Sequence, residues 1–321
     1  MQVLVLAGGL SAERDVSLRS GRRVAEALRA ARPGWEVLER DVDAELLTAL
    51  ADDAPDCVVP LLHGSAGEDG AVRDVLECLG LPYVGSRAAS SRLAFDKPVA
   101  KTLVRRAGLS APSAVALPHA TFRELGAPGV MAALERGVGF PLVVKPARGG
   151  SALGVSIVRT REELPAAMVG AFAYGDVAML EHFIDGTEVA VGVVETPDGP
   201  VALPAVEIVP DGGFYDYAAR YTAGTTEFYV PARLDPAVAE AAAAAALLAH
   251  RTLGLRDWSR SDLIIDAAGT PWFLEVNVAP GMTETSLVPQ ALLAAGLDMG
   301  EQMATLVDRA IDRVSSPGSV A

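Results

Sequence analysis

The stretch FLEVNVAPGMTETS, residues 273–286, places Glu275 and Asn277 in an apolar segment that turns at Pro280 and Gly281. Strand side chains alternate between two faces, so Glu275 and Asn277 would share one face of a strand. A carboxylate among apolar neighbours is costly unless it is paired or coordinates a metal, and hard cations such as Mg²⁺ prefer oxygen ligands. The stretch therefore predicts a strand that contributes to a metal site.

The preceding segment RSDLIID, residues 260–266, supplies a second acidic group. Asp262 begins another apolar strand, and the short turn at residues 267–269 predicts an antiparallel hairpin that brings Asp262 close to Glu275 and Asn277. Two carboxylates and an amide can form a Mg²⁺ site whose remaining ligands are phosphate and water. Arg260 lies beside this group.

A glycine-rich loop in VVKPARGGSALGVSIV, residues 143–158, follows an apolar strand that ends in Lys145. Flexible backbone amides beside a compact positive charge are typical of a site for an anionic ligand. Lys97, Lys101 and Lys145 are the only lysines in an otherwise arginine-based set of basic residues, and a lysine point charge suits phosphate. The pattern is not GxxxxGK[ST], because the lysine precedes the loop, and an ordinary β-hairpin loop is the alternative.

Two further stretches carry glutamates that allow two interpretations each. In AGGLSAERDVS, residues 7–17, Glu13 falls in the first turn of a predicted helix, where it could offset the helix dipole or bind an amino group. The glycines there do not satisfy GxGxxG, which disfavours a dinucleotide site. In MLEHFIDGTE, residues 179–188, Glu181 and Glu188 flank a turn typical of a hinge that could hold a nucleoside, although solvated glutamates are the simpler interpretation.

The order of the predicted elements indicates an α/β chain in three parts. Strands alternate with helices over residues 1–94, which predicts a parallel, doubly wound sheet with ligands beyond the carboxyl ends of its strands. Residues 95–182 follow an α+β pattern with the glycine-rich loop between two strands. Residues 183–321 contain an irregular polar and aromatic passage at 210–227, an alanine-rich helix and the hairpin that carries Asp262.

Composition narrows the function classes. The 321 residues include 27 basic and 41 acidic side chains, a formal net charge of −14, which disfavours a nucleic-acid or anionic-membrane surface and favours small-molecule substrates. Cys57 and Cys78 lie in apolar settings typical of free thiols in a reducing cytoplasm. The apolar run at residues 3–7 is interpreted as a strand rather than a signal peptide, and no run approaches the ~18 apolar residues of a membrane helix. We therefore expect a cytoplasmic protein.

Taken together, these motifs resemble the D-alanine–D-alanine ligase family of the ATP-grasp superfamily over nearly the whole chain. The matching passages are, in order, GGLSAERDVSL, LLHGSAGEDG, LPYVGS, AFDKPVAK, VVKPARGGSALGVS, FYDYAARY, SRSDLII and LEVNVAPGMTETSLVP. Each passage is modest alone, but eight in this order are highly specific. The resemblance implies an N-terminal Rossmann-like domain followed by two ATP-grasp sub-domains, with ATP between those two.

The resemblance also implies functional residues at matching positions of this sequence. The implied contacts to the ATP phosphates are Lys97, Lys145, Ser151 and Arg220. The implied contacts to adenosine are Glu181, Phe183 and Glu188. The implied ligands of two Mg²⁺ ions, which Mn²⁺ could replace, are Asp262, Glu275 and Asn277. The implied contacts to the first D-alanine are Glu13, Ser151, Tyr221 and His63. The implied oxyanion site consists of Arg260 and the Gly281 amide. The implied anchor of the second substrate's carboxylate consists of Ser286 and Leu287.

The activity implied by the resemblance is the ATP-dependent joining of two D-alanines for peptidoglycan synthesis. The first D-alanine becomes an acyl phosphate, and the second amine attacks it while Arg260 and Gly281 stabilise the developing charge. The passage at 210–227 would close over the site as a lid, with Tyr221 at its edge, and exclude water. The resemblance also implies a homodimer.

Several positions depart from the commoner family pattern. Arg220 stands where a lysine is usual, Ala152 replaces a frequent serine, and Leu10 replaces threonine or valine. Val278 and Ala279 replace small hydroxyl residues. Because these changes weaken the substrate assignment more than the reaction class, a ligase that joins a different amino-acid pair is the close alternative.

Two alternatives come from other function classes. A nicotinamide-dependent oxidoreductase is disfavoured by the incomplete glycine pattern and would leave the metal group unused. A non-catalytic nucleotide sensor would need the same ATP contacts but gives no reason for Arg260 and Glu13. A ligase accounts for all of these residues.

Overall fold

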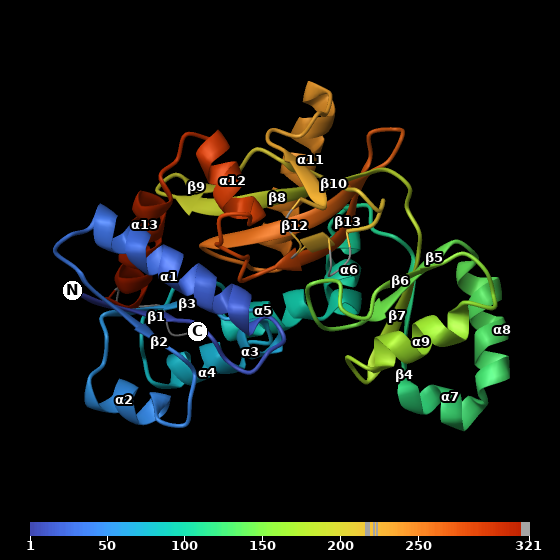
Figure 1. The fold of residues 1–321 in the computed structure, drawn as a ribbon, viewed down its shortest axis with the longest axis horizontal. Helices are drawn as coiled ribbons and strands as arrows, with labels where there is room; N and C mark the ends of the chain where they lie inside the picture. Colours follow the sequence, from blue (N-terminus) through green and yellow to red (C-terminus); the bar gives the residue numbers. More distant parts are fainter. Residues whose placement is uncertain (216–218, 221, 223, 316–321) are drawn as a thin grey trace.

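The computed structural model describes residues 1–215, 219–220, 222 and 224–315, and it is an elongated molecule built on three β-sheets within those residues (Figure 1). The sheets use strands at residues 2–60, 114–182 and 187–277. The α/β prediction is confirmed, while the part boundaries at 94 and 182 stay a prediction. No helix in these described ranges is long and apolar enough to cross a membrane.

The N-terminal sheet is parallel, as the alternating pattern predicts. Its strand order is β2-β1-β3, and Tyr83 adds only an isolated parallel bridge to Val58. Helices cover both faces, because neighbouring residues of β1 such as Val5 and Leu6 pack into different cores. The elements are β1 (Gln2–Leu6), α1 (Arg14–Ala31), β2 (Glu36–Arg40), α2 (Leu46–Asp52), β3 (Cys57–Pro60), α3 (Ser65–Glu68), α4 (Ala71–Cys78) and α5 (Ala88–Phe95).

Helix α13 (Met299–Ser315) returns to this first sheet from the far end of the chain. It packs against α1 and β3, and its residues Ala304 and Val307 share one core with Val5 and Leu28. Figure 1 shows the dark red helix beside the blue one. Residues predicted with the third part therefore complete the core of the first.

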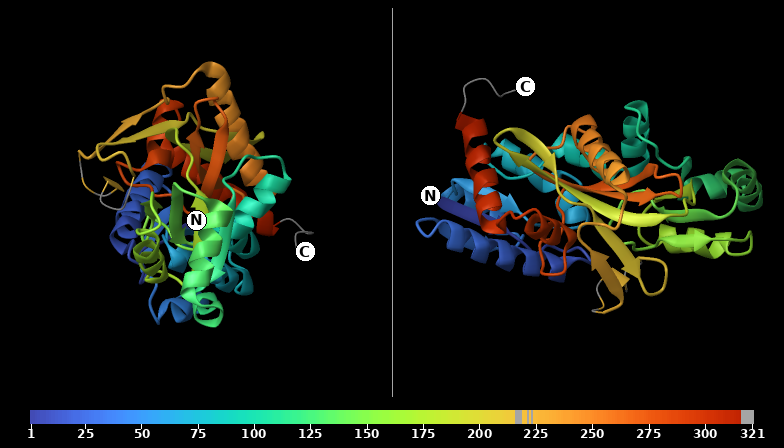
Figure 2. Two further views of the ribbon diagram at one scale, coloured as in Figure 1. Left: turned by 90° about the vertical axis from the view of Figure 1, so that its right-hand side faces the viewer. Right: turned by 90° about the horizontal axis from the view of Figure 1, so that it is seen from above.

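A four-stranded antiparallel sheet carries the glycine-rich loop. Its order is β4-β7-β5-β6, and the loop joins β5 to β6, as the strand–loop–strand prediction requires. Figure 2 shows that this green part of the molecule projects at one end of the long axis. The elements are α6 (Lys97–Arg106), β4 (Ala114–Pro118), α7 (His119–Leu125), α8 (Ala127–Val138), β5 (Leu142–Pro146), β6 (Ser156–Val158), α9 (Leu164–Phe172) and β7 (Val177–His182).

The third sheet is antiparallel and contains the predicted hairpin. Its order is β11-β10-β8-β12-β13, with β9 paired to β8. Asp262 lies opposite Glu275 and Arg260 opposite Asn277, which is the neighbourhood that the hairpin predicts. The elements are β8 (Thr187–Thr196), β9 (Gly199–Ala202), β10 (Val206–Pro210), β11 (Thr226–Tyr229), α11 (Pro236–Thr252), β12 (Trp258–Ile265), β13 (Pro271–Asn277) and α12 (Leu287–Ala294).

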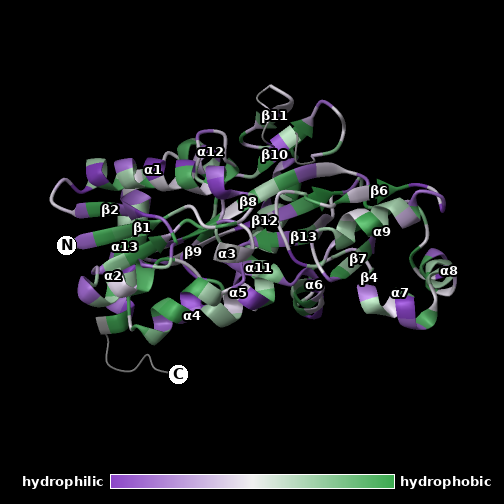
Figure 3. Cartoon of the chain, turned by 60° about the horizontal axis from the view of Figure 1, so that its bottom comes forward, coloured by the Kyte–Doolittle hydropathy of each residue, from purple (hydrophilic) through white to green (hydrophobic). Residues whose placement is uncertain are grey.

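Hydropathy explains the layering of these elements. Figure 3 shows mainly hydrophobic colouring along the inner strand β8, whereas α1 alternates hydrophobic and hydrophilic residues around its axis. Helix α11 packs on the sheet through small side chains such as Ala242 and Ala246, which share a core with Val191 and Leu263. An inner strand is buried on both faces, and a surface helix on only one.

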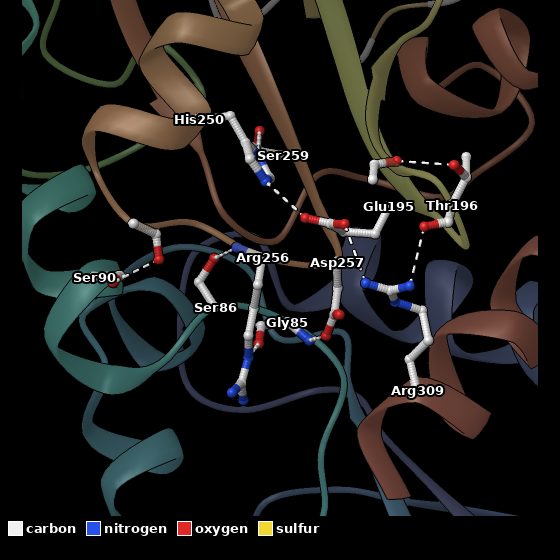
Figure 4. Close-up of polar contacts among 12 residues, drawn as sticks. Gly85, Ser86, Ser90, Glu195, Thr196, His250, Arg256, Asp257, Ser259 and Arg309 are labelled. Atoms are coloured by element: carbon white, nitrogen blue, oxygen red, sulfur yellow. Dashed lines mark hydrogen bonds and ion pairs between the residues drawn. The ribbon is translucent and has the colours of Figure 1, made fainter. Parts of the chain in front are cut away.

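A polar seam around Asp257 joins the first sheet to the third. Asp257 is fully buried, accepts the Gly85 N–H at 2.6 Å, and accepts two bonds from Arg313 at 2.6 and 2.9 Å. Arg256 donates to the Gly85 carbonyl at 2.6 Å (Figure 4). Because Asp257 immediately precedes β12, this Asp257 seam fixes the strand that carries Arg260 against the N-terminal part.

A second group of buried titratable side chains lies beside the Asp257 seam (Figure 4). His250 Nδ1 lies 2.8 Å from the Ser259 hydroxyl, and its Nε2 lies 3.6 Å from a Glu195 carboxylate oxygen. Glu195 also pairs with Arg309 at 3.2 Å. Burial lowers the pKa of His250 to about 4, so this imidazole is neutral in the folded protein at pH 7.

Candidate active site

A first cavity of about 440 Å³ lies between the second and third sheets. Apolar residues such as Val143, Phe183 and Leu274 give it walls suited to a planar base. Burial raises the pKa of Glu188, which also lines it, to about 7, with Arg220 opposing the rise. The residues predicted to contact ATP that line this cavity are Lys97, Lys145, Glu181, Phe183, Glu188 and Arg220.

Glu181 lies between two buried lysines in this cavity. Its carboxylate is 2.5 Å from Lys145 Nζ and 2.8 Å from Lys101 Nζ. Burial by itself raises the pKa of Glu181, but the two ammonium groups outweigh it and the net pKa is lowered. The pair therefore keeps Glu181 ionised and able to accept hydrogen bonds from a ligand.

The three residues predicted to bind metal lie together at one end of the β12–β13 hairpin. Arg260 binds both oxygens of Asp262 at 2.7 and 2.8 Å, and Asn277 Nδ2 donates to Asp262 at 3.4 Å. Glu275 lies 3.1 Å from Lys97 Nζ. Burial raises the pKa of Glu275, but the surrounding cations, Lys97 first, lower it to about 2. Glu275 is therefore ionised, as metal binding requires.

A second cavity of about 370 Å³ adjoins the first, because Glu275 and Arg220 line both. It gathers predicted residues from distant segments of the chain, although Tyr221 lies outside the described residues. The gathered residues are Glu13, His63, Ser151, Arg260, Asn277, Gly281, Ser286 and Leu287. Ser151 lines this second cavity rather than the first, so its place favours the substrate contact over the phosphate contact.

Glu13 and Ser151 join the N-terminal part to the glycine-rich loop. The Ser151 hydroxyl donates to Glu13 Oε1, and Ser151 has a positive φ of 52°. A side chain at Gly64, whose φ is 69°, would place a Cβ 2.6 Å from Glu13 Oε2. Glycine at position 64 therefore leaves the space that this carboxylate occupies.

The loop between β13 and α12 lines another part of the second cavity. The Ser286 hydroxyl accepts the Thr283 N–H at 3.0 Å and also lies 2.8 Å from the Thr283 hydroxyl. The N–H groups of Gly281 and Leu287 donate to no group within the described chain. Both are therefore available to an anionic group in the cavity.

Known proteins match this chain over most of its length. A family model described as "D-ala D-ala ligase C-terminus" matches residues 103–308. The D-alanine–D-alanine ligase of Anaeromyxobacter sp. (strain Fw109-5) is 44% identical over 309 residues, which cover 96% of each chain. This chain belongs to the D-alanine–D-alanine ligase family.

Solved structures of this ligase family share the fold over nearly the full length. The D-alanine–D-alanine ligase from Bacillus anthracis complexed with ATP has a TM-score of 0.79 at 28% identity and covers 99% of each chain. The VanG D-Ala:D-Ser ligase from Enterococcus faecalis has a TM-score of 0.82 at 29% identity and covers 96% of this chain and 99% of its own.

The side chains of this ligase-family site suit a hard cation that takes its remaining ligands from phosphate and water. No group of three His, Cys, Asp or Glu side chains that could hold a metal occurs among the residues that the structure describes. Asp262, Glu275 and Asn277 instead offer two carboxylates and one amide, and Mg²⁺ commonly completes such a set with phosphate and water. The residues thus fit the ion only together with a phosphate ligand.

Sequence reasoning missed three residues of the ligase-family site. Lys101 is one of the three lysines and lies one helical turn from Lys97, a spacing that places both on one face of α6. Glu68 falls in the quoted passage LLHGSAGEDG, accepts the Gly64 N–H at 3.0 Å, and has its pKa raised to about 8 by burial and then by Glu13. Tyr215 falls in the quoted passage FYDYAARY, and Arg220 stacks on its ring.

Two of the positions that depart from the ligase pattern differ in their surroundings. Val278 is 1% exposed and packs in the core of the third sheet, so it does not face the substrate cavity. Ala279 lines the cavity, and its carbonyl oxygen lies 2.9 Å from His63 Nδ1. Burial lowers the pKa of His63 to about 4, so His63 is neutral here. Of these two substitutions, Ala279 is therefore the one that changes the wall of the substrate cavity.

Proposed function

We propose that this chain joins two D-alanines to D-alanyl-D-alanine with conversion of ATP to ADP and phosphate, for peptidoglycan synthesis. The single observation that carries the proposal is the meeting of two cavities at Glu275. One cavity holds cations suited to phosphates. The other presents a carboxylate, Glu13, and anion-binding N–H groups at Gly281 and Leu287, which match the two ends of a pair of amino acids.

ATP would occupy the first cavity. Phe183 and Leu274 provide apolar walls for the base, and Lys145 with Lys97 provides charge for the phosphates. The carboxylates of Asp262 and Glu275, with Asn277, would hold Mg²⁺. When bound, Mg²⁺ supplies charge neutralisation for the phosphates.

The first D-alanine would place its ammonium group at Glu13 and its carboxylate toward Glu275 and the phosphates. Ser151 donates to Glu13 and so keeps the carboxylate of Glu13 oriented. The carboxylate of the first D-alanine then attacks the γ-phosphorus of ATP. The bond between the γ-phosphorus and the bridging oxygen of ADP breaks as the new bond forms, so the products are an acyl phosphate and ADP. Alignment of the reacting atoms and neutralisation of charge lower the barrier to this step.

The second D-alanine would place its carboxylate at Ser286 and Leu287, and its amine would attack the acyl phosphate. Negative charge then develops on the former carboxyl oxygen. Arg260, which Asp262 orients at 2.7 and 2.8 Å, and the Gly281 N–H are the donors available for that charge. Phosphate leaves as the peptide bond forms.

The passage at residues 210–227 would exclude water from the acyl phosphate. Its described residues Tyr215, Ala219, Arg220, Thr222 and Gly224 line the second cavity. A segment that forms one wall of the substrate cavity is placed to close over it.

A ligase that joins D-alanine to a different amine is the second candidate. Two observations favour it: Ala279 changes the wall of the substrate cavity, and one solved structure with a TM-score of 0.82 is a D-Ala:D-Ser ligase. The test is phosphate release from ATP and Mg²⁺ with a panel of D- and L-amino acids, followed by mass measurement of the product. Turnover with D-alanine alone and a product of D-alanyl-D-alanine mass is expected. Turnover only with a mixed pair would establish the second candidate instead.

The proposal includes a cytoplasmic homodimer. The observations behind the location are the two cysteines without a disulfide, Cys57 and Cys78, and the absence of a membrane-crossing helix from the described residues. Sedimentation of the purified protein measures the assembly state. A monomer at assay concentration would contradict the dimer and leave the ligase activity a separate question.

A further inference from the structure

The loop between β13 and α12 is buried although it has no regular structure. Pro280, Met282 and Thr283 are all buried, so their backbone polar groups need partners other than water. Part of this need is met by Ser20 on α1, whose hydroxyl accepts the Met282 N–H at 3.0 Å. This loop, which lines the substrate cavity, is therefore held in part by α1.

Arg23, one turn further along α1, supplies two further contacts to this loop. Its Nη1 donates to the Met282 carbonyl at 3.1 Å and to the Thr283 carbonyl at 2.6 Å. No carboxylate in the described chain pairs with Arg23, so these two carbonyl groups accept the hydrogen bonds of its guanidinium group. Hydrogen bonds from an ionised donor are stronger than neutral ones, and the planar guanidinium fixes their direction.

The contact to Met282 passes directly to Ser286. In a trans peptide the C=O and N–H groups point in opposite directions, so fixing the Met282 carbonyl also fixes the Thr283 N–H. That N–H donates to the Ser286 hydroxyl at 3.0 Å. One peptide unit therefore links a guanidinium outside the substrate cavity to a hydroxyl inside it.

We propose that Arg23 is a positioning residue for the second-substrate end of the cavity, acting through the Met282–Thr283 peptide on Ser286. The role of Ser286 itself rests on the proposed function. Arg23 does not line the substrate cavity, so its effect is on the geometry of the anchor rather than on any contact with substrate. Loss of Arg23 weakens binding of the second amino acid selectively.

The test compares Arg23→Met, which keeps the apolar stem, with Arg23→Lys, which keeps the charge. Arg22→Met is the matched control, because Arg22 is the exposed neighbour on the same helix. Steady-state kinetics of the full-length protein should show KM for the second D-alanine raised about tenfold in Arg23→Met, with partial rescue in Arg23→Lys. KM for ATP and for the first D-alanine should stay within about twofold, as should all constants of Arg22→Met.

Hydrogen exchange gives a second measurement that does not depend on turnover. In Arg23→Met, the peptide containing the Thr283 amide should exchange faster than in the wild type and in Arg22→Met. Unchanged exchange there, or an unchanged KM for the second D-alanine, overturns the positioning role. A parallel rise of every KM also overturns it, because a general structural defect has no preference for one substrate. Absence of turnover in the wild type with every amino-acid pair is the separate outcome that overturns the proposed function.

Discussion

Replacing Asp257 should weaken the attachment of the first sheet to the third. The resulting loss of unfolding free energy measures what the Asp257 seam contributes to stability. The carboxylate is fully buried and accepts three hydrogen bonds, one from Gly85 and two from Arg313. In Asp257→Ala, the Gly85 N–H loses its acceptor, which costs about 1–3 kcal/mol, and Arg313 loses its carboxylate. Breaking a buried pair costs about 3–5 kcal/mol, but Arg313 is 29% exposed and water compensates part of that loss.

The backbone of Asp257 adds a smaller cost to the alanine variant. Its φ is 67°, a conformation in which alanine costs about 1–2 kcal/mol and aspartate or asparagine is better tolerated. We therefore expect Asp257→Ala to lose about 4 kcal/mol of unfolding free energy in total, a non-additive sum of these terms. Asp257→Asn keeps the backbone preference and an oxygen for Gly85, so it should lose about half as much.

Urea denaturation followed by the fluorescence of Trp258, which is fully buried beside the seam, measures both variants. Asp257 precedes the strand that carries Arg260, and Glu13 lies on the N-terminal part. KM for the first D-alanine should therefore rise in the alanine variant, because these two sides of the substrate cavity lose their alignment. A loss below about 1 kcal/mol in Asp257→Ala would refute the reasoning, since it would mean that the buried carboxylate is not a stabilising contact.

Three further predictions concern single side chains. Glu275→Gln should lower kcat by more than about 100-fold with little change in the far-ultraviolet circular dichroism, and near-normal turnover would contradict its role at the phosphates. Ser286→Ala should chiefly raise KM for the second D-alanine, which initial-rate kinetics measure; an unchanged KM would exclude the anchor role. His250 has a folded pKa of about 4 against 6.5 in the unfolded chain, so the unfolded chain binds the extra proton and stability falls as pH drops from 6.5 toward 4. When the pH is lowered from 7 to 5, the unfolding free energy of His250→Asn, measured by urea denaturation, should fall by about 2 kcal/mol less than that of the wild type. Equal falls in the two proteins would argue that His250 is not buried in its neutral form.

The site could be predicted from sequence where local spacing determines geometry. Glu275 and Asn277 share a face because a strand has a period of two, and a short turn sets the register that places Asp262 opposite Glu275. The β5–loop–β6 arrangement follows from a glycine-rich segment between two short apolar runs. In both cases the relevant contacts lie within about twenty residues of sequence.

Contacts between distant segments could not be predicted in this way. Lys101 meets Glu181 across 80 positions, and Arg23 meets Thr283 across 260, and no periodicity relates such pairs. Burial also reverses what the sequence suggests about charge. Glu68 looks like a solvated acid in a polar passage, yet the structure buries it beside Glu13 and raises its pKa to about 8.

Helix α13 has a consequence for how the protein is made. The first sheet leaves the ribosome early, but one face of its core includes Ala304, Val307 and Ala310 of α13. That face stays exposed until synthesis has passed residue 315, so the N-terminal part spends most of translation without its final covering. A truncated chain that lacks α13 would carry an uncovered apolar surface on its first sheet, and exposed apolar surface of this kind makes incomplete chains prone to aggregate.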